Sequence, residues 1–141
     1  MDVRELSSDA DIEVACALAR QLRDRVRPET FLSEIRRQQR DGYRLFGGFD
    51  DGRLVCLAGA RRSHTLSRGE HLFVDDLVTT AEARGRGHGG EMLRWIGQWA
   101  AAEGVPRVYL DSRETARGFY ERAGFTFLTS IPCWIETPGS R

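Results

Sequence analysis

Residues 75–93, DDLVTTAEARGRGHGGEML, contain the pattern on which the fold depends: a strand end, a short polar crossing and a loop that opens a helix. The loop is rich in glycine, at Gly85, Gly87, Gly89 and Gly90. Without side chains, its backbone N–H groups can approach an anion closely. The helix expected from about Gly89 directs its unpaired N–H groups and the positive end of its dipole at the same place. Phosphate groups bind at such helix starts, and Arg84 and Arg86 can pair with phosphate oxygens. The loop is therefore predicted to hold a diphosphate.

One interpretation of this loop is a dinucleotide site. Residues 85–90 satisfy the pattern GxGxxG, and Asp111 follows at about the distance of a ribose-binding acid. That fold requires a strand that turns directly into the first glycine, whereas Thr79 to Arg84 intervene here. It also requires further βα units, and only 30 residues of the 141 follow Asp111. A nucleotide-binding redox module is kept as an alternative only under this interpretation.

The other interpretation depends on R-x-x-G-x-G, present at residues 84–89. With Leu77 and Val78 before it and FYERAGF at residues 119–125 after it, the chain resembles the GNAT superfamily of acyl-CoA N-acyltransferases. The loop resembles motif A of that family and FYERAGF its motif B, and the resemblance covers residues 43–125. It implies one N-acetyltransferase domain over residues 1–141 with an α/β (α+β) fold. The sheet would be mixed and mostly antiparallel, with about six or seven strands, splayed central strands and about four helices on both faces.

The resemblance also implies acetyl-CoA as the cofactor and assigns roles to residues. The implied cofactor-binding residues are Leu77, Val78, Thr79, Arg84, Gly85, Arg86, Gly87, His88, Gly89, Gly90 and Arg113. Main-chain groups at the strand end would pair with the pantetheine amides, and one N–H, in first place that of Val78, would hold the thioester oxyanion. Tyr120 matches the motif B tyrosine that protonates the leaving thiolate; packing beside Phe119 is its alternative role. His88 and Arg113 depart from the family pattern, which has an aliphatic residue and often an asparagine at these positions.

Proton removal from the acceptor is the harder step, because an amine with a pKa of about 10.4 is protonated at neutral pH. Asp75 is the first candidate base, with Asp76 and Glu70 behind it. Since successive side chains of a strand alternate, Asp75 and Asp76 are expected on opposite faces. A structural ion pair is the alternative role for either carboxylate. His64 is expected at the surface, and His71 is left without a role.

Hydrophobic periodicity and turn residues predict the remaining elements. Helices are expected from Ser8 to Val26, from Pro28 onward, after Gly89, and from Ser112 to Ala123. Strands are expected at residues 3–6, 43–49, 53–60, 71–78, 107–111, 125–128 and 133–136. Asp51-Gly52 predicts a two-residue hairpin turn between two of them.

Composition limits the partners. The 21 basic residues balance the 21 acidic ones, so no net field favours nucleic acid or an anionic membrane. All the basic residues are arginine, and the chain has no lysine. Three scattered cysteines show no metal-binding spacing, and the first residues, MDVREL, show no apolar leader. A cytoplasmic location without a metal is expected.

The sequence thus favours an N-acetyltransferase that acts by direct attack of a primary amine, on a small molecule or a peptide, upon the thioester. A non-catalytic CoA-binding or regulatory domain is the alternative. The residues are also compatible with a homodimer.

Overall fold

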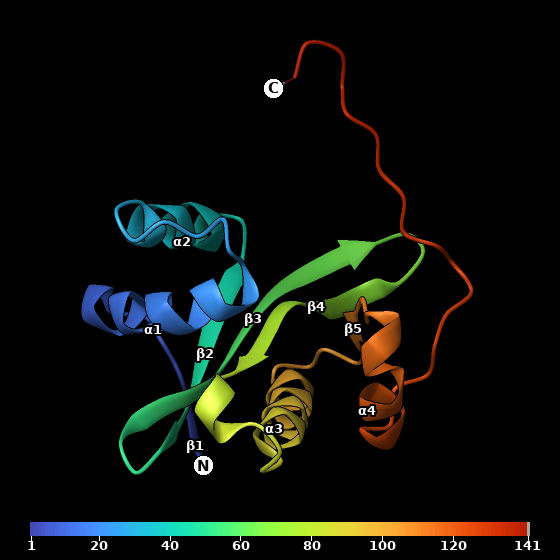
Figure 1. Cartoon of the computed structure of the whole chain (residues 1–141). Helices are drawn as coiled ribbons and strands as arrows, with labels where there is room; N and C mark the ends of the chain where they lie inside the picture. The colour runs from blue at the N-terminus through green and yellow to red at the C-terminus, as the bar shows by residue number, and fades with distance from the viewer. Residues whose placement is uncertain (141) are drawn as a thin grey trace.

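The computed structural model describes residues 1–140 (Figure 1). Its elements are β1 (Asp2–Glu5), α1 (Asp9–Leu22), α2 (Phe31–Arg40), β2 (Tyr43–Asp50), β3 (Arg53–Thr65), β4 (Gly69–Thr79), η1 (Ala81–Ala83), α3 (His88–Ala102), β5 (Val108–Leu110), η2 (Glu114–Ala116) and α4 (Arg117–Arg122). Among these residues, no helix is long and apolar enough to cross a bilayer.

The strands form one five-stranded sheet in the order β1-β2-β3-β4-β5. Its pairs are antiparallel except β4 and β5, which run parallel, so the predicted mixed and mostly antiparallel α/β fold is confirmed. The predicted number of strands is wrong, because residues 125–128 and 133–136 form none. Both segments have a strand-like composition, but a strand also needs a neighbouring strand with which to form hydrogen bonds.

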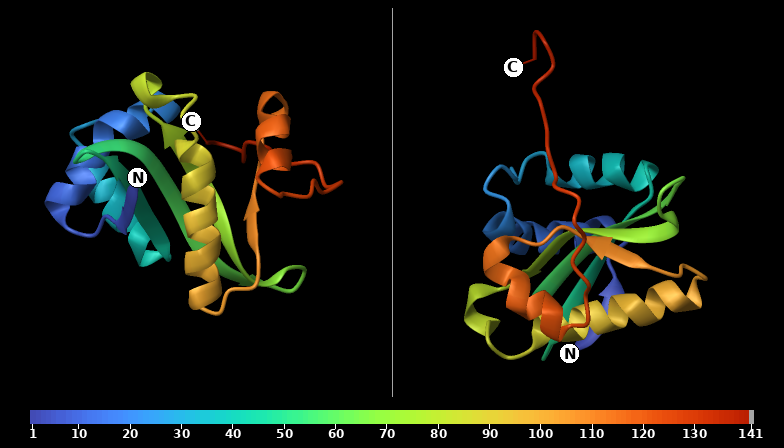
Figure 2. Two further views of the ribbon diagram at one scale, coloured as in Figure 1. Left: turned by 90° about the horizontal axis from the view of Figure 1, so that it is seen from below. Right: turned by 90° about the vertical axis from the view of Figure 1, so that its right-hand side faces the viewer.

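Helices cover both faces of the sheet (Figure 2). On one face α1 packs against β3 and β4, and α2 against β2; on the other, α3 packs against β3 and β4. Each face has its own apolar cluster. The first includes Ile12, Leu18, Leu45, Leu57 and Val78; the second includes Phe46, Leu72, Val74, Met92 and Ile96.

Local signals explain several boundaries. The Ser8 hydroxyl accepts a hydrogen bond from the Asp11 N–H at 3.1 Å and caps α1, as predicted. Asp51 and Gly52 both have positive φ and form the predicted hairpin turn. The second helix begins at Phe31 rather than Pro28. The predicted helix over residues 112–123 is replaced by η2 and the short α4, and the Ser112 hydroxyl donates to the Arg113 carbonyl oxygen instead of capping.

A β-bulge in β4 changes which side chains share a face. Gly59 of β3 pairs with Asp76 and the next residue, Ala60, pairs with Val74, so Asp75 is the extra residue. Val74 therefore packs in the α3 cluster, whereas Val78 packs in the α1 cluster. The expectation that Asp75 and Asp76 point to opposite faces is wrong, because strict alternation holds only in a strand without a bulge.

The predicted splay of the central strands stays a prediction, because β5 is the edge strand and ends at Leu110, its last residue paired with β4. β4 pairs with β5 only from Leu72 to Val74. Beyond that point β4 continues to Thr79 while pairing with β3 alone. One edge of β4 therefore faces an opening between the two strands.

Candidate active site

The open edge of β4 presents the main-chain groups of alternate residues. The Thr80 N–H donates to the Val55 carbonyl oxygen at 2.8 Å, and Leu57 pairs with Val78 in the same register. In an antiparallel ladder, the main-chain N–H and C=O groups of successive residues point alternately toward the partner strand and away from it. The N–H of Val78 therefore faces β3, and those of Leu77 and Thr79 face the opening. The Thr79 carbonyl oxygen also points away from β3, since it accepts a hydrogen bond from Arg84 Nε at 3.4 Å. Leu77 and Thr79 thus have groups available to a ligand.

The glycine loop leads into a helix start that no side chain caps. Gly85 and Gly87 have φ angles of 78° and 84°, which side chains disfavour. A Cβ built on Gly85, Gly87 or Gly90 would meet no atom within 4 Å. The space before α3 is therefore open, and its unpaired N–H groups can reach an anion there.

The loop adjoins the other predicted site elements. A Cβ on Gly89 would lie 3.2 Å from the Phe119 ring and 3.8 Å from Thr79 Oγ1. The end of β4, the start of α3 and the helix α4 therefore meet at one place, as the two sequence motifs predict.

His88 lies in the first turn of α3 and is only 8% exposed. Both of its ring nitrogens are buried and have no hydrogen-bond partner among the described residues. A buried polar group normally has a partner, so an unpaired ring at this position indicates that something else completes its hydrogen bonds.

Three exposed arginines were predicted to bind the phosphates, two of them in the loop and one before η2. Arg84 and Arg86 are exposed within the loop, and Arg113 is exposed at the residue before η2. None of the three forms an ion pair with a residue in positions 1–140. Their charges are free to neutralise phosphate oxygens.

Tyr120 lies on α4 between two aromatic neighbours. Its ring makes edge-on contacts with Phe119 and Phe125, with centroid distances of 4.9 Å and 5.6 Å. Burial raises the pKa of the Tyr120 phenol above its usual value. The hydroxyl therefore remains protonated at neutral pH, which is the state a proton donor needs.

Asp75 and Asp76 lie on the face of the sheet that carries α1 and α2, and each forms an ion pair. Asp75 accepts two hydrogen bonds from Arg61, both at 2.8 Å. Asp76 accepts from Arg23 Nε at 3.1 Å and from the Tyr43 hydroxyl at 2.9 Å. Burial, followed by the charge of Asp76, raises the pKa of Tyr43 well above its usual value.

A cavity of about 630 Å³, the Asp75 cavity, opens beside these carboxylates. Its lining consists of charged and polar side chains: Arg23, Glu34, Arg37, Gln38, Asp41, Arg61, Asp75 and Asp76. Both β4 carboxylates therefore face one small polar space that a ligand with charged groups could enter.

The sequence interpretation missed Arg23 and Arg61, which line this cavity, and Tyr43, which donates a hydrogen bond to Asp76. A Cβ on Gly59 would lie 1.7 Å from the Tyr43 hydroxyl oxygen, so Tyr43 crosses β3 over this glycine to reach Asp76 on β4. An isolated glycine inside an apolar strand often marks a bulge or a close approach. Gly59, within LVCLAGA, was therefore the available signal.

The other candidate bases lie elsewhere. Glu70 pairs with Arg62 at 3.4 Å near the opposite end of β4 and does not line the Asp75 cavity. His64 is exposed, as expected, with 72% of its side-chain surface accessible. His71 is buried, and its Nδ1 lies 2.8 Å from the Gly69 carbonyl oxygen.

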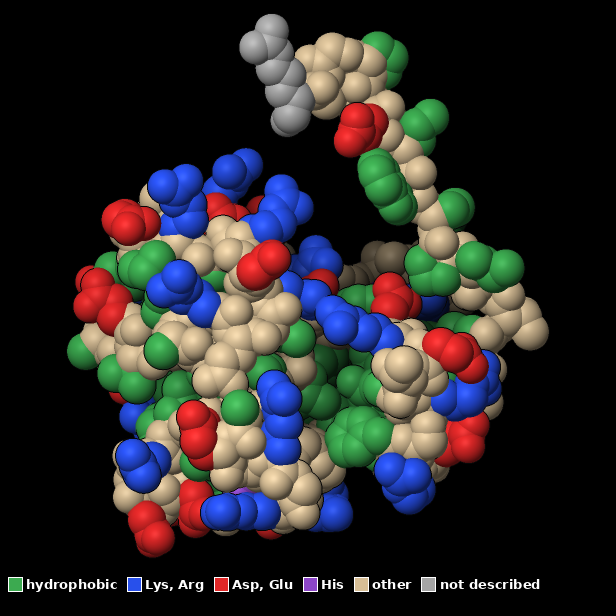
Figure 3. Space-filling model, in the orientation of Figure 1, with side chains coloured by type: hydrophobic (Ala, Val, Ile, Leu, Met, Phe, Trp, Pro, Cys, Tyr) green, Lys and Arg blue, Asp and Glu red, His purple; other side chains and the backbone are tan. Residues whose placement is uncertain are grey.

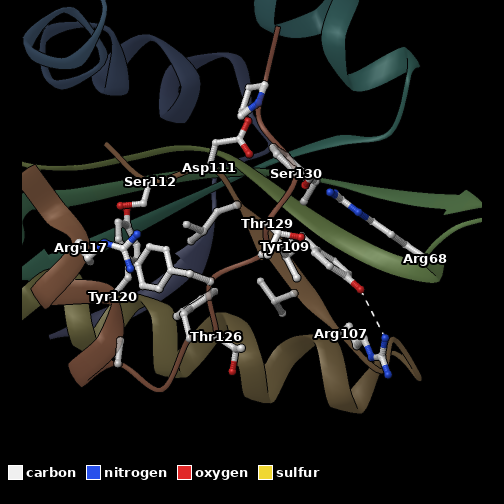
Figure 4. Close-up of a pocket in the computed structure, with 18 of the residues that line it drawn as sticks. Arg68, Arg107, Tyr109, Asp111, Ser112, Arg117, Tyr120, Thr126, Thr129 and Ser130 are labelled. Atoms are coloured by element: carbon white, nitrogen blue, oxygen red, sulfur yellow. Dashed lines mark hydrogen bonds between the residues drawn. The ribbon is translucent and has the colours of Figure 1, made fainter. Parts of the chain in front are cut away.

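A larger cavity, of about 1090 Å³, lies between β5 and residues 125–132 (Figure 4). We refer to it as the β5 cavity. Of the predicted site residues, only Tyr120 lines it; the glycine loop and the open edge of β4 do not. Size therefore does not identify the active site in this molecule, because the larger cavity lies beyond β5.

Comparison with known proteins gives consistent results. The model of the acetyltransferase (GNAT) family matches residues 12–125. An uncharacterized N-acetyltransferase of Bacillus subtilis, YhdJ, is 32% identical over 129 residues, which cover 88% of this chain and 91% of the relative.

Solved structures share the fold. The aminoglycoside N-acetyltransferase AAC(6')-Iy, in complex with CoA, superposes with a TM-score of 0.82 at 17% identity, covering 96% of this chain and 93% of its own. An acetyltransferase of Trypanosoma brucei superposes with a TM-score of 0.78 at 23% identity, covering 96% and 99%. At these identities the likeness concerns the fold alone.

Proposed function

Because this chain belongs to the GNAT family of acetyltransferases, we propose that it transfers an acetyl group from acetyl-CoA to a primary amine of a small molecule or peptide. One observation carries the proposal. The open helix start of α3, the end of β4 with the unpaired N–H groups of Leu77 and Thr79, and the helix α4, which carries Phe119 and Tyr120, meet at one place.

The pyrophosphate of the donor would bind the N–H groups of residues 86–90. The absence of any atom within 4 Å of a Cβ on Gly87 or Gly90 supports this, as does the unpaired ring of His88. Arg84, Arg86 and Arg113 would neutralise phosphate charge. The pantetheine arm would then lie along β4 and pair with it as an added strand.

For the oxyanion we propose the N–H of Leu77 in place of that of Val78. Val78 pairs with Leu57 across the ladder, and its N–H is directed at β3. Leu77 lies one residue closer to the bulge, and its N–H points into the opening. A donor placed there stabilises the charge that develops on the carbonyl oxygen as the amine attacks.

Two side chains would handle protons. Asp75 would accept the proton of the ammonium group, directly or through water, while Arg61 holds its carboxylate in position. Tyr120 would donate a proton to the departing thiolate. With a thiol pKa of about 8.5, the thiolate leaves without much assistance, so Tyr120 has the smaller effect on rate.

A non-catalytic CoA-binding domain is the second candidate, because Asp75 and Asp76 are both engaged in ion pairs. Release of free CoA in the presence of an amine panel separates the two functions, since only an enzyme turns over. The chain has no lysine, so acetyl-lysine detected after reaction with a peptide must come from the peptide.

The proposal extends to the wider setting. Residues 1–141 would act as one N-acetyltransferase domain in the cytoplasm, consistent with three free cysteines at Cys16, Cys56 and Cys133. We also propose a homodimer.

The test uses substitutions on one helix. Gly90→Val places a branched side chain in the open space before α3 without the backbone strain that Gly87→Val would add at φ 84°. We expect calorimetry to show acetyl-CoA binding at least about 10²-fold weaker, because the anion can no longer approach the N–H groups. Gly97→Val, also in α3 and in open space, should bind as the parent does. Equal affinity of the two variants would place the pyrophosphate elsewhere.

A further inference from the structure

The Asp75 cavity has two walls. The sheet wall comes from β3, β4 and the end of α1 and consists of Arg23, Arg61, Asp75 and Asp76. The α2 wall consists of polar residues that recur at helical spacing: Glu34, Arg37, Gln38 and Asp41. Phe31 and Ile35 bury another face of this helix in the apolar cluster, so the polar stripe is left to face the cavity.

The charges of the sheet wall are paired with one another. Arg61 donates two hydrogen bonds to Asp75, and Arg23 donates to Asp76 and, at 2.9 Å, to the Asp75 carbonyl oxygen. A carboxylate has about four acceptor positions, so Asp75 can accept an ammonium group and keep Arg61. The sheet wall can therefore bind one amine of a ligand, whereas its two arginines are already engaged.

The α2 wall differs, because its charges are not paired. Arg37 and Asp41 are four positions apart, a spacing at which opposite charges on a helix can meet. Neither forms an ion pair with any of residues 1–140. Glu34 accepts a hydrogen bond from Gln38 at 3.2 Å. A ligand in the cavity thus meets an arginine and a carboxylate that have no partner at ion-pair distance in the described part of the chain.

The lining as a whole has one negative charge in excess, since it contains three arginines and four carboxylates. Figure 3 shows basic and acidic side chains close together over the upper part of the molecule, where Figure 1 places α2. The two walls influence each other: hydrogen bonds to Asp75 are the first cause that raises the pKa of Arg61, and the charge of Asp41 adds to the rise. With an anionic group opposite Arg37, electrical balance requires two cationic groups on the ligand.

Simpler amines match only part of this lining. A monoamine or a polyamine has no anionic group, so it leaves Arg37 without a counter-charge. An amino acid with a single amine brings no cation to Asp41 once that amine lies at Asp75. A lysine inside a peptide has neither a free α-amine nor a free carboxylate. A free α-amino acid with a primary amine on its side chain has two ammonium groups and one carboxylate at neutral pH.

We propose that the acceptor is a free basic α-amino acid, either lysine or a homologue with a shorter side chain. This assignment rests on the proposed acetyltransferase function. The side-chain amine lies at Asp75 and the α-ammonium group at Asp41. The α-carboxylate pairs with Arg37, because a planar guanidinium can bind both carboxylate oxygens.

The cavity and the reaction both suit such an acceptor. The volume of about 630 Å³ lies within the range of about 300–1,000 Å³ that is usual for small-molecule sites. The side-chain nitrogen forms a bond to the acetyl carbonyl carbon as the C–S bond breaks. CoA leaves as the thiol, and one proton of the ammonium group passes to solvent.

The first experiment compares amines that differ by one group, through release of free CoA by the full chain. Lysine has all the required groups, cadaverine lacks the carboxylate, and 6-aminohexanoate lacks the α-amine. Lysine should have a kcat/KM at least about 10-fold above that of either analogue, because each analogue lacks one charged hydrogen-bonding group. Fragmentation of the product in a mass spectrometer should place the acetyl group on the side-chain nitrogen.

Two substitutions should remove the two preferences separately. Arg37→Gln should abolish the advantage of lysine over cadaverine and keep its advantage over 6-aminohexanoate, and Asp41→Asn should do the reverse. A partly unfolded variant would lower the rates with all amines together and cannot give this crossed pattern. Arg40→Gln is the control: Arg40 lies on α2 without lining the cavity, so this variant should keep both preferences.

Three results overturn the proposal. Either analogue could be used as well as lysine, the acetyl group could lie on the α-nitrogen, or Arg37→Gln could lower the rates with lysine and cadaverine equally. Equal use of lysine and Nα-acetyl-lysine amide would indicate a lysine within a peptide and would also overturn it. CoA is released in each of these cases, so the proposed function stands.

A binding measurement separates the ligand class from catalysis. Lysine is titrated by calorimetry into the protein saturated with CoA, which carries no acetyl group to transfer. Lysine should bind at least about 10-fold more weakly to Arg37→Gln than to Arg40→Gln. This difference in binding without turnover would remove the proposed function and keep the ligand class. Neither binding nor turnover of any amine would remove both.

Discussion

The first 105 residues and the last 35 described residues differ sharply in how they pack. Every buried side chain, from Leu6 to Val105, lies in the first region. From Pro106 to Ser140 no described residue is buried. Both regions contain apolar stretches of strand-like or helical pattern. The contrast teaches that such a pattern becomes a packed element only where a complementary surface is available.

The edge strand β1 makes this clear. Its sequence, DVRE, has less strand character than FTFL or CWIE, yet it forms a strand because β2 offers an antiparallel partner from Phe46 to Phe49. The C-terminal segment, residues 125–140, has stronger local preference and no partner within the chain. Pairing, more than propensity, decides strand formation here.

The largest expected effect tests the packed region directly. Ile96 is fully buried in the cluster between α3 and the sheet. Ile96→Ala should lower the free energy of unfolding by about 2–5 kcal/mol, through lost burial and the cavity left behind. Chemical denaturation of the parent and the variant measures this difference in the free energy of unfolding, provided that the two m-values are equal.

Ile135→Ala removes the same atoms from a side chain that is 86% exposed. At a protein concentration low enough to give monomers, this variant should unfold within about 0.5 kcal/mol of the parent. A large loss in the dilute monomer would mean that the C-terminal segment packs against its own chain and would break the comparison.

The next effect comes from a glycine on which the first region depends. A Cβ on Gly59 would occupy the position of the Tyr43 hydroxyl, so Gly59→Ala must expel Tyr43 and break its bond to Asp76. We expect a loss of about 3 kcal/mol from overpacking and the lost charged hydrogen bond. The matched control is Gly97→Ala, in open space on α3, which should stabilise the fold by up to about 1 kcal/mol. Thermal melts of both variants decide it, and equal melting temperatures would contradict the packing argument.

Much of the fold could be predicted from local sequence. The Ser8 cap, the Asp51-Gly52 turn and the glycine loop each act over a few residues, and each is found as predicted.

What could not be predicted depends on contacts between distant residues. The bulge at Asp75 appears only when β3 and β4 are paired, and it reverses the face of every later side chain on β4. The ion pairs of Asp75 and Asp76 join residues from β3 and from the end of α1, which lie 14 and 53 positions away. The missing last strands likewise reflect the absence of a partner, a property that their own composition does not contain.

A further prediction concerns the bulge residue Asp75 and tests whether the packed region, residues 1–105, also carries out the chemical step. Asp75→Asn should lower kcat/KM by about 10²-fold near neutral pH, since general-base assistance is lost. Activity should recover as rising pH deprotonates the amine without assistance. Asp76→Asn should instead lower stability by about 1.5 kcal/mol, because Arg23 and Tyr43 lose a charged acceptor. A parental pH–rate profile for Asp75→Asn would remove it as the base and shift the role to Asp76 or solvent.

The smallest expected effect is on catalysis by Tyr120, the residue of the second region, residues 106–140, that has a proposed catalytic role. Tyr120→Phe retains the ring contacts with Phe119 and Phe125, so acetyl-CoA affinity and melting temperature should hardly change. We expect kcat to fall about 10-fold, and no more than about 10²-fold, because the thiolate is already a fair leaving group.

Burial raises the pKa of Tyr120, and its acid form is the active one. The parent should therefore keep this contribution through neutral and mildly alkaline pH and lose it only as pH rises through that elevated pKa. The variant should lack this alkaline decline. Stopped-flow measurement of the chemical step from neutral to strongly alkaline pH tests both features. If Tyr120→Phe had the kcat and the pH–rate profile of the parent, Tyr120 would only pack against its neighbours, and the second region would have no part in catalysis.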